Sequence, residues 1–218
     1  MGVEIFDCAQ GSEVWLECRL GLPTASKFST VLAKGEGKIR SKYMRQLAGE
    51  VITGEPAETF SNSHMERGHA MEDEARQTYA FINDVEPVRV GFIRNGNKGA
   101  SPDSLIGTNG GLEIKSAIPE IQIDRLERGR LPPEHVAQVQ GCLWVTEREY
   151  WDFVSYWPRL PVLTVRVHRD EEYIKTLSDE IDRFNDELAA LVDRIRRYGQ
   201  PALKMEDLPE SARLLMAG

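Results

Sequence analysis

The sequence predicts an α/β (α+β) protein in which helices flank a central mixed β-sheet. Helical patterns dominate the first third of the chain, short apolar runs of strand type fill the middle, and one long amphipathic segment follows. Helices on both sides of such strands bury one sheet between them. With 218 residues, 41% of them hydrophobic, the chain can bury the core of a single domain over residues 1–198, with 199–218 as an extension.

The helices are expected from apolar residues spaced three and four apart. They comprise a short helix capped by Thr24 or Ser26, and longer ones over residues 42–53, 64–83, 133–146 and 171–198. Glu72 lies next to the apolar stripe of the third helix, so we expect it to face inwards. Prolines 132 and 133 suit the first turn of the fourth. Trp15 and Trp144 are expected in the core.

The strands are expected from short runs rich in apolar and β-branched residues. These runs cover residues 88–94, 104–108, 112–116, 151–156 and 163–168. The second and third flank Asn109-Gly110, which is the strongest short-range signal for a tight hairpin. On the second strand of this hairpin, Glu113 and Lys115 are two residues apart, so both side chains point to the same face.

Composition excludes several classes of protein. No apolar run is long enough to cross a bilayer, and the N-terminus lacks a basic region followed by an apolar stretch. The three cysteines have no metal-ligand spacing, which is typical of reduced thiols in a cytoplasmic protein. A net charge of −8 argues against binding nucleic acid by bulk charge. Two local clusters of basic residues lie around 34–45 and 125–130, and a solvated charged loop is the slightly favoured interpretation of each.

The predicted hairpin carries a possible catalytic centre. Asp103 precedes its first strand and can approach Glu113 on the second, where Lys115 lies two residues further along. Two carboxylates suit a divalent cation such as Mg²⁺, which also takes waters and substrate phosphate as ligands. A neighbouring lysine could orient the attacking water, stabilise the phosphoryl oxygens or act as a general base. The alternative is an exposed cross-strand charge pair on an ordinary hairpin.

The whole chain resembles the lambda exonuclease and YqaJ-type viral recombinase family, whose restriction-endonuclease-like core is that of the PD-(D/E)xK nucleases. Four blocks match in order. They are Trp15–Gly21 with Thr24–Ser26, Arg67–Ala75, Ser101–Asp103 with Leu112–Lys115, and Ala137–Gln140 with Trp144–Thr146. The resemblance covers about residues 12–193, and the ordered set is far more specific than any single block.

The resemblance implies a metal centre. Asp103, Glu113 and the backbone carbonyl of Ile114 would bind Mg²⁺, with Mn²⁺ expected to substitute. Glu72 would complete the carboxylate set, as a ligand of a second ion or through a water. Lys115 would act on the nucleophilic water.

The resemblance also implies phosphate contacts. Gln138 would position the lysine or the scissile phosphate. Arg19 and Ser26 would bind the 5′-phosphate of the digested strand, and Ser101 would contact phosphate near the metal. Taken alone, an arginine such as Arg19 is more often a surface ion-pair partner, and a serine such as Ser26 is more often a helix cap.

The function implied is a Mg²⁺-dependent 5′→3′ exonuclease of double-stranded DNA ends. It would release mononucleotides from the 5′-phosphorylated strand and leave a 3′ overhang for a single-strand annealing protein in phage-type DNA recombination and double-strand break processing. The family forms a homotrimer ring, and a phage or prophage enzyme of this kind acts in the bacterial cytoplasm, away from membranes. Three alternatives remain: an endonuclease of the same fold, a noncatalytic DNA-end-binding module, and a recombination scaffold acting through the last helix and the tail.

Overall fold

The computed structural model describes residues 2–33, 37–57 and 63–200, with residues 63–70 described by their backbone alone. Apart from Gly199 and Gln200, the expected extension over 199–218 lies outside these ranges. So do residues 34–36 of the first basic segment and the side chain of Arg67. Within the described part of the chain, no helix is long and apolar enough to cross a membrane.

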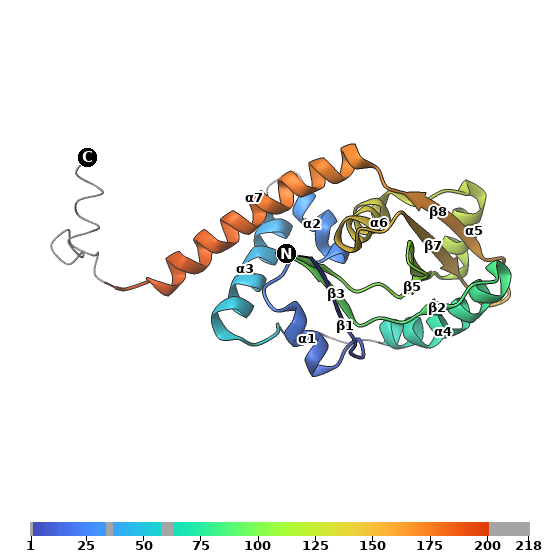
Figure 1. Ribbon diagram of the computed structural model, residues 1–218, viewed down its shortest axis with the longest axis horizontal. Coiled ribbons are helices and arrows are strands. Elements are labelled where there is room, and N and C mark those ends of the chain that lie inside the picture. The colour runs from blue at the N-terminus through green and yellow to red at the C-terminus, as the bar shows by residue number, and fades with distance from the viewer. Residues whose placement is uncertain (1, 34–36, 58–62, 201–218) are drawn as a thin grey trace.

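A five-stranded mixed sheet lies at the centre of the molecule (Figure 1). Its order is β2 (Pro87–Val88), β5 (Ser104–Ile106), β6 (Gly110–Ser116), β7 (Tyr150–Tyr156) and β8 (Leu163–His168). Only β6 and β7 run parallel; the other neighbours are antiparallel. Parallel neighbours need a crossover, and here α5 (Pro119–Arg128) and α6 (Pro133–Thr146) supply it. The predicted mixed sheet between helices is confirmed.

Helices cover both faces of this sheet, and β6 therefore has two different sides. On one face, Leu112 and Ile114 pack with residues of α4 (Ser63–Asn83) in one buried cluster. On the other face, Glu113 and Lys115 point towards α6 and contact each other. This alternation is the period of two that a strand imposes, so the expectation that Glu113 and Lys115 share a face is confirmed.

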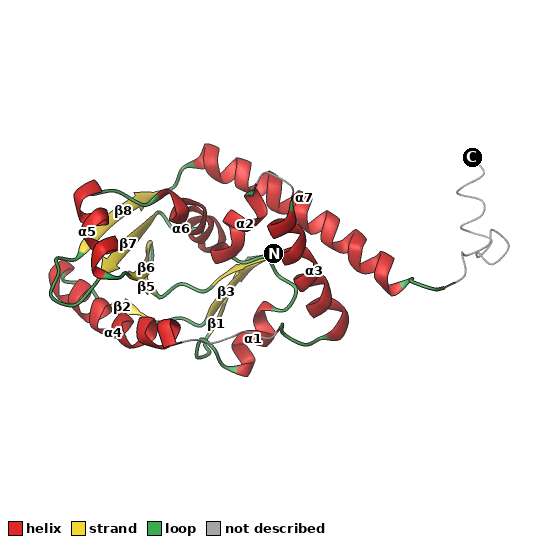
Figure 2. Cartoon of the chain, turned by 180° about the vertical axis from the view of Figure 1, so that it is seen from behind, coloured by secondary structure: helices red, strands yellow, loops and turns green. Residues whose placement is uncertain are grey.

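The N-terminal segments and the last helix form a second layer. A three-stranded antiparallel sheet has the order β1 (Val3–Phe6), β3 (Phe92–Asn95) and β4 (Lys98–Ala100). Four helical segments follow β1, namely α1 (Glu13–Arg19), η1 (Ala25–Lys27), α2 (Phe28–Leu32) and α3 (Lys38–Thr53). Helix α7 (Glu171–Arg196) runs along α2 and α3 (Figure 2). The predicted apolar stripe is buried from Ile174 to Leu188, but its last residue, Ile195, is 46% exposed.

The strand expected over residues 88–94 is two strands in different sheets. β2 ends at Val88 and β3 begins at Phe92, so the chain changes sheet over residues 89–91. Gly91 permits this crossing, because a Cβ there would lie 2.2 Å from the Cys8 carbonyl oxygen. A side chain would therefore push the N-terminal segment away. The apolar pattern of residues 88–94 runs on without a break. The interruption of the strand coincides with the close approach of Gly91 to the backbone of Cys8.

The hairpin is present, but its turn differs from the expected one. The turn covers Gly107, Thr108 and Asn109, and Gly107 has a φ of +49°. Gly110 belongs to β6, where a Cβ would lie 2.3 Å from the Tyr150 ring. Gly110 is therefore needed for packing against β7 rather than for the turn, and the left-handed position falls on Gly107 instead.

Candidate active site

The predicted constellation of Asp103, Glu113 and Lys115 is assembled. Asp103 directly precedes β5, and the register pairs Ser104 with Leu112, which brings Asp103 beside the next residues of β6. Its Oδ2 accepts a hydrogen bond of 2.5 Å from the backbone N–H of Ile114. The Lys115 Nζ lies 2.6 Å from the Glu113 Oε1. This is an inward-facing cluster, because only 3% of the Glu113 side chain is exposed, so the exposed charge pair is the wrong alternative.

Gln138 reaches this cluster from α6. Its Nε2 donates a hydrogen bond of 2.6 Å to the Glu113 Oε1, the same oxygen that Lys115 contacts. Gln138, expected to position Lys115 or the scissile phosphate, thus contacts Glu113 directly. The other carboxylate oxygen, Glu113 Oε2, is buried and has no hydrogen-bond partner among the residues that the structure describes. A buried acceptor without a partner carries a desolvation cost and marks a place where a ligand belongs.

Asp103 and Lys115 have shifted pKa values, and the direction of each shift indicates its role. Burial raises the pKa of Asp103 well above its ordinary value, and the charges of Glu113 and Glu72 raise it further, against the opposing effect of Lys115. Burial lowers the pKa of Lys115, but Glu113 and Asp103 together outweigh it, so that pKa is raised. Lys115 is therefore charged in this arrangement and acts as a hydrogen-bond donor, which disfavours the general-base role.

Glu72 adjoins the cluster through a residue that the sequence analysis missed. Arg76, one turn further along α4, forms an ion pair with Glu72. It also donates to the Asp103 backbone carbonyl at 3.2 Å and to the Ser104 Oγ at 2.8 Å. Arg76 is buried and follows Ala75 on the apolar stripe of α4. A charged residue at such a position could have been recognised from helical spacing alone.

The donor set fits a hard divalent cation. The N–H and C=O of a strand residue point to the same edge, so the Ile114 carbonyl faces Asp103 as its N–H does. Asp103, the unpartnered Glu113 Oε2 and this carbonyl are oxygen donors of the kind Mg²⁺ prefers, and one or two carboxylates suffice when waters and phosphate complete the shell. Within the described ranges no three His, Cys, Asp or Glu side chains lie close enough to hold a metal by themselves, so Glu72 stands apart from the pair.

A groove of about 580 Å³ opens onto the cluster. Glu72, Arg76, Arg89 and Asp103 are among its lining residues. Gln10 closes one side, donating to the backbone carbonyls of residues 90 and 102 at 3.1 and 2.8 Å. The N-terminal segment is thereby fastened to the peptide that precedes Asp103. Asp103 and Glu72 are reached from this groove, whereas the buried Glu113 is not among its lining residues.

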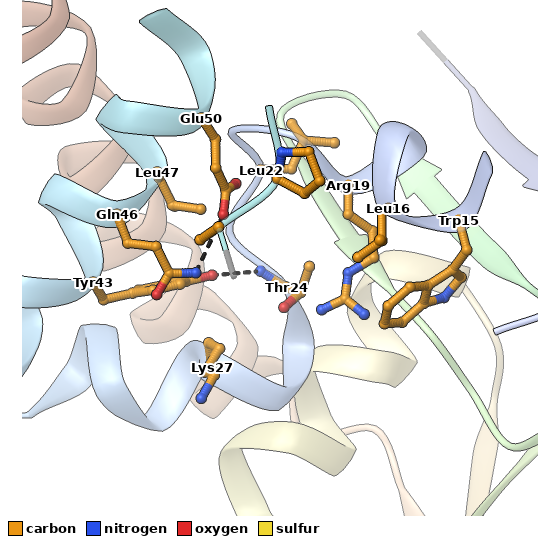
Figure 3. A pocket seen from close by; sticks show the side chains of 12 residues that line it. Trp15, Leu16, Arg19, Leu22, Thr24, Lys27, Tyr43, Gln46, Leu47 and Glu50 are labelled. Atoms are coloured by element: carbon orange, nitrogen blue, oxygen red, sulfur yellow. Dashed lines mark hydrogen bonds between the residues drawn. The ribbon is translucent and has the colours of Figure 1, made fainter. Parts of the chain in front are cut away.

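Arg19 lies in a separate small pocket of about 90 Å³ (Figure 3). Its guanidinium is 3.7 Å from the centroid of the Trp15 ring. Tyr43 and Glu50 of α3 line the opposite wall, and Glu50 is engaged there by the backbone N–H of residue 21 at 3.0 Å. Burial lowers the pKa of Arg19, while Tyr43 and Glu50 act the other way. No carboxylate in the described part of the chain forms an ion pair with Arg19, so its fork is available to an anion.

The other two expected phosphate contacts lie in different surroundings. Ser26 is exposed, with its Oγ 3.5 Å from the Thr24 Oγ1. Thr24 lines the Arg19 pocket, whereas Ser26 does not. Ser101 accepts a hydrogen bond of 3.0 Å from the Trp15 indole N–H. Trp15, expected in the core, is half-buried between Arg19 and Ser101.

The two basic segments are largely engaged in the fold. Arg125 lies on α5 rather than in a loop, and its Nη1 donates to the Ser155 Oγ at 3.0 Å. Arg128 pairs with Asp124 at 2.8 Å. In the first segment, Arg40 forms an ion pair of 2.6 Å with Glu187. The expectation of a solvated charged loop is therefore wrong for Arg40 and Arg125, which lie on helices α3 and α5 and contact other elements of the fold.

Comparison with known proteins places these residues in a family. The family model of the YqaJ-like viral recombinase domain matches residues 14–149, a range that contains every candidate residue above. Two crystal structures of LHK-Exo, an alkaline exonuclease from Laribacter hongkongensis, have TM-scores of 0.80 and 0.79 at 34% and 32% identity. In both, the similarity covers 85% of this chain and 97% of the relative, and the first is a complex with dAMP.

A phage-related exonuclease from Haemophilus somnus 129PT shares the fold, with a TM-score of 0.60 and 14% identity over 80% of this chain and 96% of its own. The expected restriction-endonuclease-like core is confirmed by the LHK-Exo superposition. A search of curated proteins found no match. The chain belongs to the YqaJ-like viral recombinase family.

Proposed function

We propose that this protein is a Mg²⁺-dependent 5′→3′ exonuclease of double-stranded DNA ends. It digests the 5′-phosphorylated strand to mononucleotides and leaves a 3′ single-stranded overhang. The observation that carries the proposal is the pair Asp103 and Glu113, with Lys115 alongside and one buried carboxylate oxygen left without a partner. An exonuclease role is further supported by the similarity to LHK-Exo.

Each residue of the site has a different role in the proposed hydrolysis. Bound Mg²⁺ would supply an activated water and neutralise charge on the phosphate. Gln138 and Lys115 hold the Glu113 Oε1, which leaves Oε2 for the cation. The Ile114 N–H fixes Asp103 opposite it. Lys115, held in its charged form, donates hydrogen bonds to the attacking water or to the phosphoryl oxygens as negative charge develops there.

The Arg19 pocket supports the preference for a 5′-phosphate. Its volume of about 90 Å³ is well below the roughly 300–1,000 Å³ of pockets that enclose small organic molecules. It therefore suits a terminal group rather than a whole nucleotide. A guanidinium fork binds a phosphate through two parallel hydrogen bonds. An endonuclease has no terminal phosphate to place in such a pocket, and this favours the exonuclease over its alternative.

The proposal is tested on linear duplex DNA with one 5′-phosphorylated and one 5′-hydroxyl end, digested with Mg²⁺ and compared with Lys115→Ala. Selective loss of the phosphorylated strand, absent in the variant, is the expected result. Equal loss of both strands would refute the role of Arg19 and leave the nuclease in place. Binding of ends with no digestion would favour the noncatalytic module.

The biological setting is part of the same proposal. We propose that the enzyme acts as a ring-shaped homotrimer in the bacterial cytoplasm and hands its overhang to a single-strand annealing protein. Family membership supports this setting. Sedimentation equilibrium of the full chain should give three times its mass of 24.6 kDa. A monomer under assay conditions would contradict the ring.

A further inference from the structure

Trp15 contacts Arg19 and Ser101, two of the three side chains proposed to bind phosphate outside the metal cluster. It belongs to α1, a helix of seven residues with no buried side chain. Its ring faces the Arg19 guanidinium and its indole N–H is directed at Ser101. The two contacts are made by different parts of one side chain, so each can be removed separately.

The ring face orients Arg19. The guanidinium lies 3.7 Å from the ring centroid, within the roughly 6 Å over which a cation is attracted to an aromatic face. Figure 3 shows the guanidinium directed into the pocket with the indole alongside it. Ion pairing is absent for Arg19 among the described residues, so the stack is the main restraint on its rotamer. Without it, the flexible side chain would have to be ordered by the substrate itself.

The indole N–H orients Ser101. It donates to the Ser101 Oγ at 3.0 Å and to the Gly91 carbonyl at 3.1 Å. An indole nitrogen only donates, so the Ser101 oxygen must accept and its own proton is left for another acceptor. Phosphate oxygens are acceptors. Trp15 therefore presents the serine to phosphate as a donor, two residues before Asp103.

We propose that Trp15 is the positioning residue that couples terminal-phosphate recognition to the metal cluster. Its ring holds Arg19, its N–H holds Ser101, and the rigid indole between them fixes the span from the end of the strand to Asp103. The inference rests on the proposed function, because it presumes that Arg19 and Ser101 bind phosphates of the digested strand.

Two substitutions separate the contacts. Trp15→Phe keeps an aromatic face and loses the N–H, whereas Trp15→Leu loses both. The matched control is Trp144→Phe. The Trp144 ring also makes a cation–π contact, with the Lys98 Nζ 4.3 Å from its centroid. The readouts are kcat and KM on duplexes with 5′-phosphoryl and 5′-hydroxyl ends, and thermal unfolding of each full-length variant.

Trp15→Phe is expected to lower kcat about three- to tenfold on both duplexes, as for the loss of one hydrogen bond, with the 5′-phosphate preference retained. Trp15→Leu is expected to lower kcat equally and to reduce the preference about tenfold as well. Trp144→Phe should match the wild type. If Trp15→Leu does not fold, Trp15→Gln takes its place, since it keeps an N–H donor without a ring and should lose the preference selectively.

The outcomes are distinguishable. A wild-type preference that survives in Trp15→Leu or Trp15→Gln would overturn the role of the ring. An unchanged kcat in Trp15→Phe would overturn the role of the N–H. A wild type that digests both duplexes equally would instead overturn the terminal-phosphate part of the proposed function, whatever the variants do.

Discussion

Replacing Asp103 by Asn is expected to stabilise the metal-free protein and to abolish its nuclease activity. Burial raises the pKa of Asp103, and the charges of Glu113 and Glu72 raise it further. A carboxylate whose pKa is raised by folding destabilises the folded state at every pH at which it is ionised, so its cost grows as pH rises through the folded pKa. Asn keeps the hydrogen bond from the Ile114 N–H through its amide oxygen and removes the charge.

The gain in stability from Asp103→Asn is limited, because Lys115 offsets part of the repulsion between Asp103 and the other carboxylates. Lys115 is itself one-third exposed. We therefore expect the free energy of unfolding to rise by about 1–2 kcal/mol, within the range of common stabilising substitutions. At roughly 2–4 °C per kcal/mol for chains of this size, the melting temperature in EDTA should rise by about 2–8 °C. Saturating Mg²⁺ at 100 times its Kd should stabilise the wild type by about 2.7 kcal/mol and the variant far less. With saturating Mg²⁺, the wild type should therefore be more stable than Asp103→Asn, the reverse of the order in EDTA.

The assay is thermal unfolding of wild type and Asp103→Asn in EDTA and across a Mg²⁺ titration. Asp179→Asn is the matched control, since Asp179 is an exposed carboxylate paired with Lys175 at 2.8 Å. Its stability should change by less than about 1 kcal/mol under either condition. An Asp103→Asn variant that is less stable than wild type in EDTA, or that gains as much from Mg²⁺, would refute the reasoning.

Three further predictions follow from neighbouring contacts. Gln138→Ala leaves Glu113 with one fewer charge-assisted hydrogen bond, so kcat should fall about 10- to 100-fold with little change in KM; an unchanged kcat would show that Lys115 alone orients the glutamate. Arg76→Lys cannot reproduce the arginine's fork of hydrogen bonds, and the free energy of unfolding in urea should fall by about 1–3 kcal/mol. Burial, with the charges of Lys115 and Arg125, lowers the pKa of His135 to about 4. The unfolded state therefore takes up a proton first as pH falls below 6.5, and about 2 kcal/mol should be lost by pH 5, a loss absent from His135→Gln.

The centre of the site could be predicted because its signals are local. The period of two places Glu113 and Lys115 on one face, and the hairpin returns the chain to Asp103, so three adjacent segments determine the cluster. Gln138 was expected near it from the resemblance. Its actual partner, Glu113, depends on how α6 packs across β6, which no local pattern specifies.

The elements that the sequence does not predict are short or bury few apolar side chains. Helix α5 has one buried side chain, the polar Gln122, which donates to the backbone carbonyls of Ser155 and Pro161 at 3.0 and 2.8 Å. Helix α1 buries none. β1 and β4 are four and three residues long, too short for the sequence pattern to predict them as strands. Polar burial and short strands are determined by tertiary contacts, and periodicity does not detect them.

The placement of Trp15 could not be predicted for a related reason. The indole and Ser101 are 86 residues apart in the chain, and their hydrogen bond depends on the crossing of the two sheets at Gly91. A tryptophan on a short helix is usually assigned to the core. Here its ring and its polar N–H face Arg19 and Ser101, the side chains proposed to bind phosphate.

The central claim, an exonuclease centred on Asp103 and Glu113, is tested most directly by mass spectrometry of the products from linear and closed circular duplex DNA. Wild type with Mg²⁺ should release 5′-mononucleotides from the linear duplex and leave the closed circle intact, and Glu113→Gln should release nothing. Nicked circles, oligonucleotide products, or mononucleotide release that persists in Glu113→Gln would contradict the account.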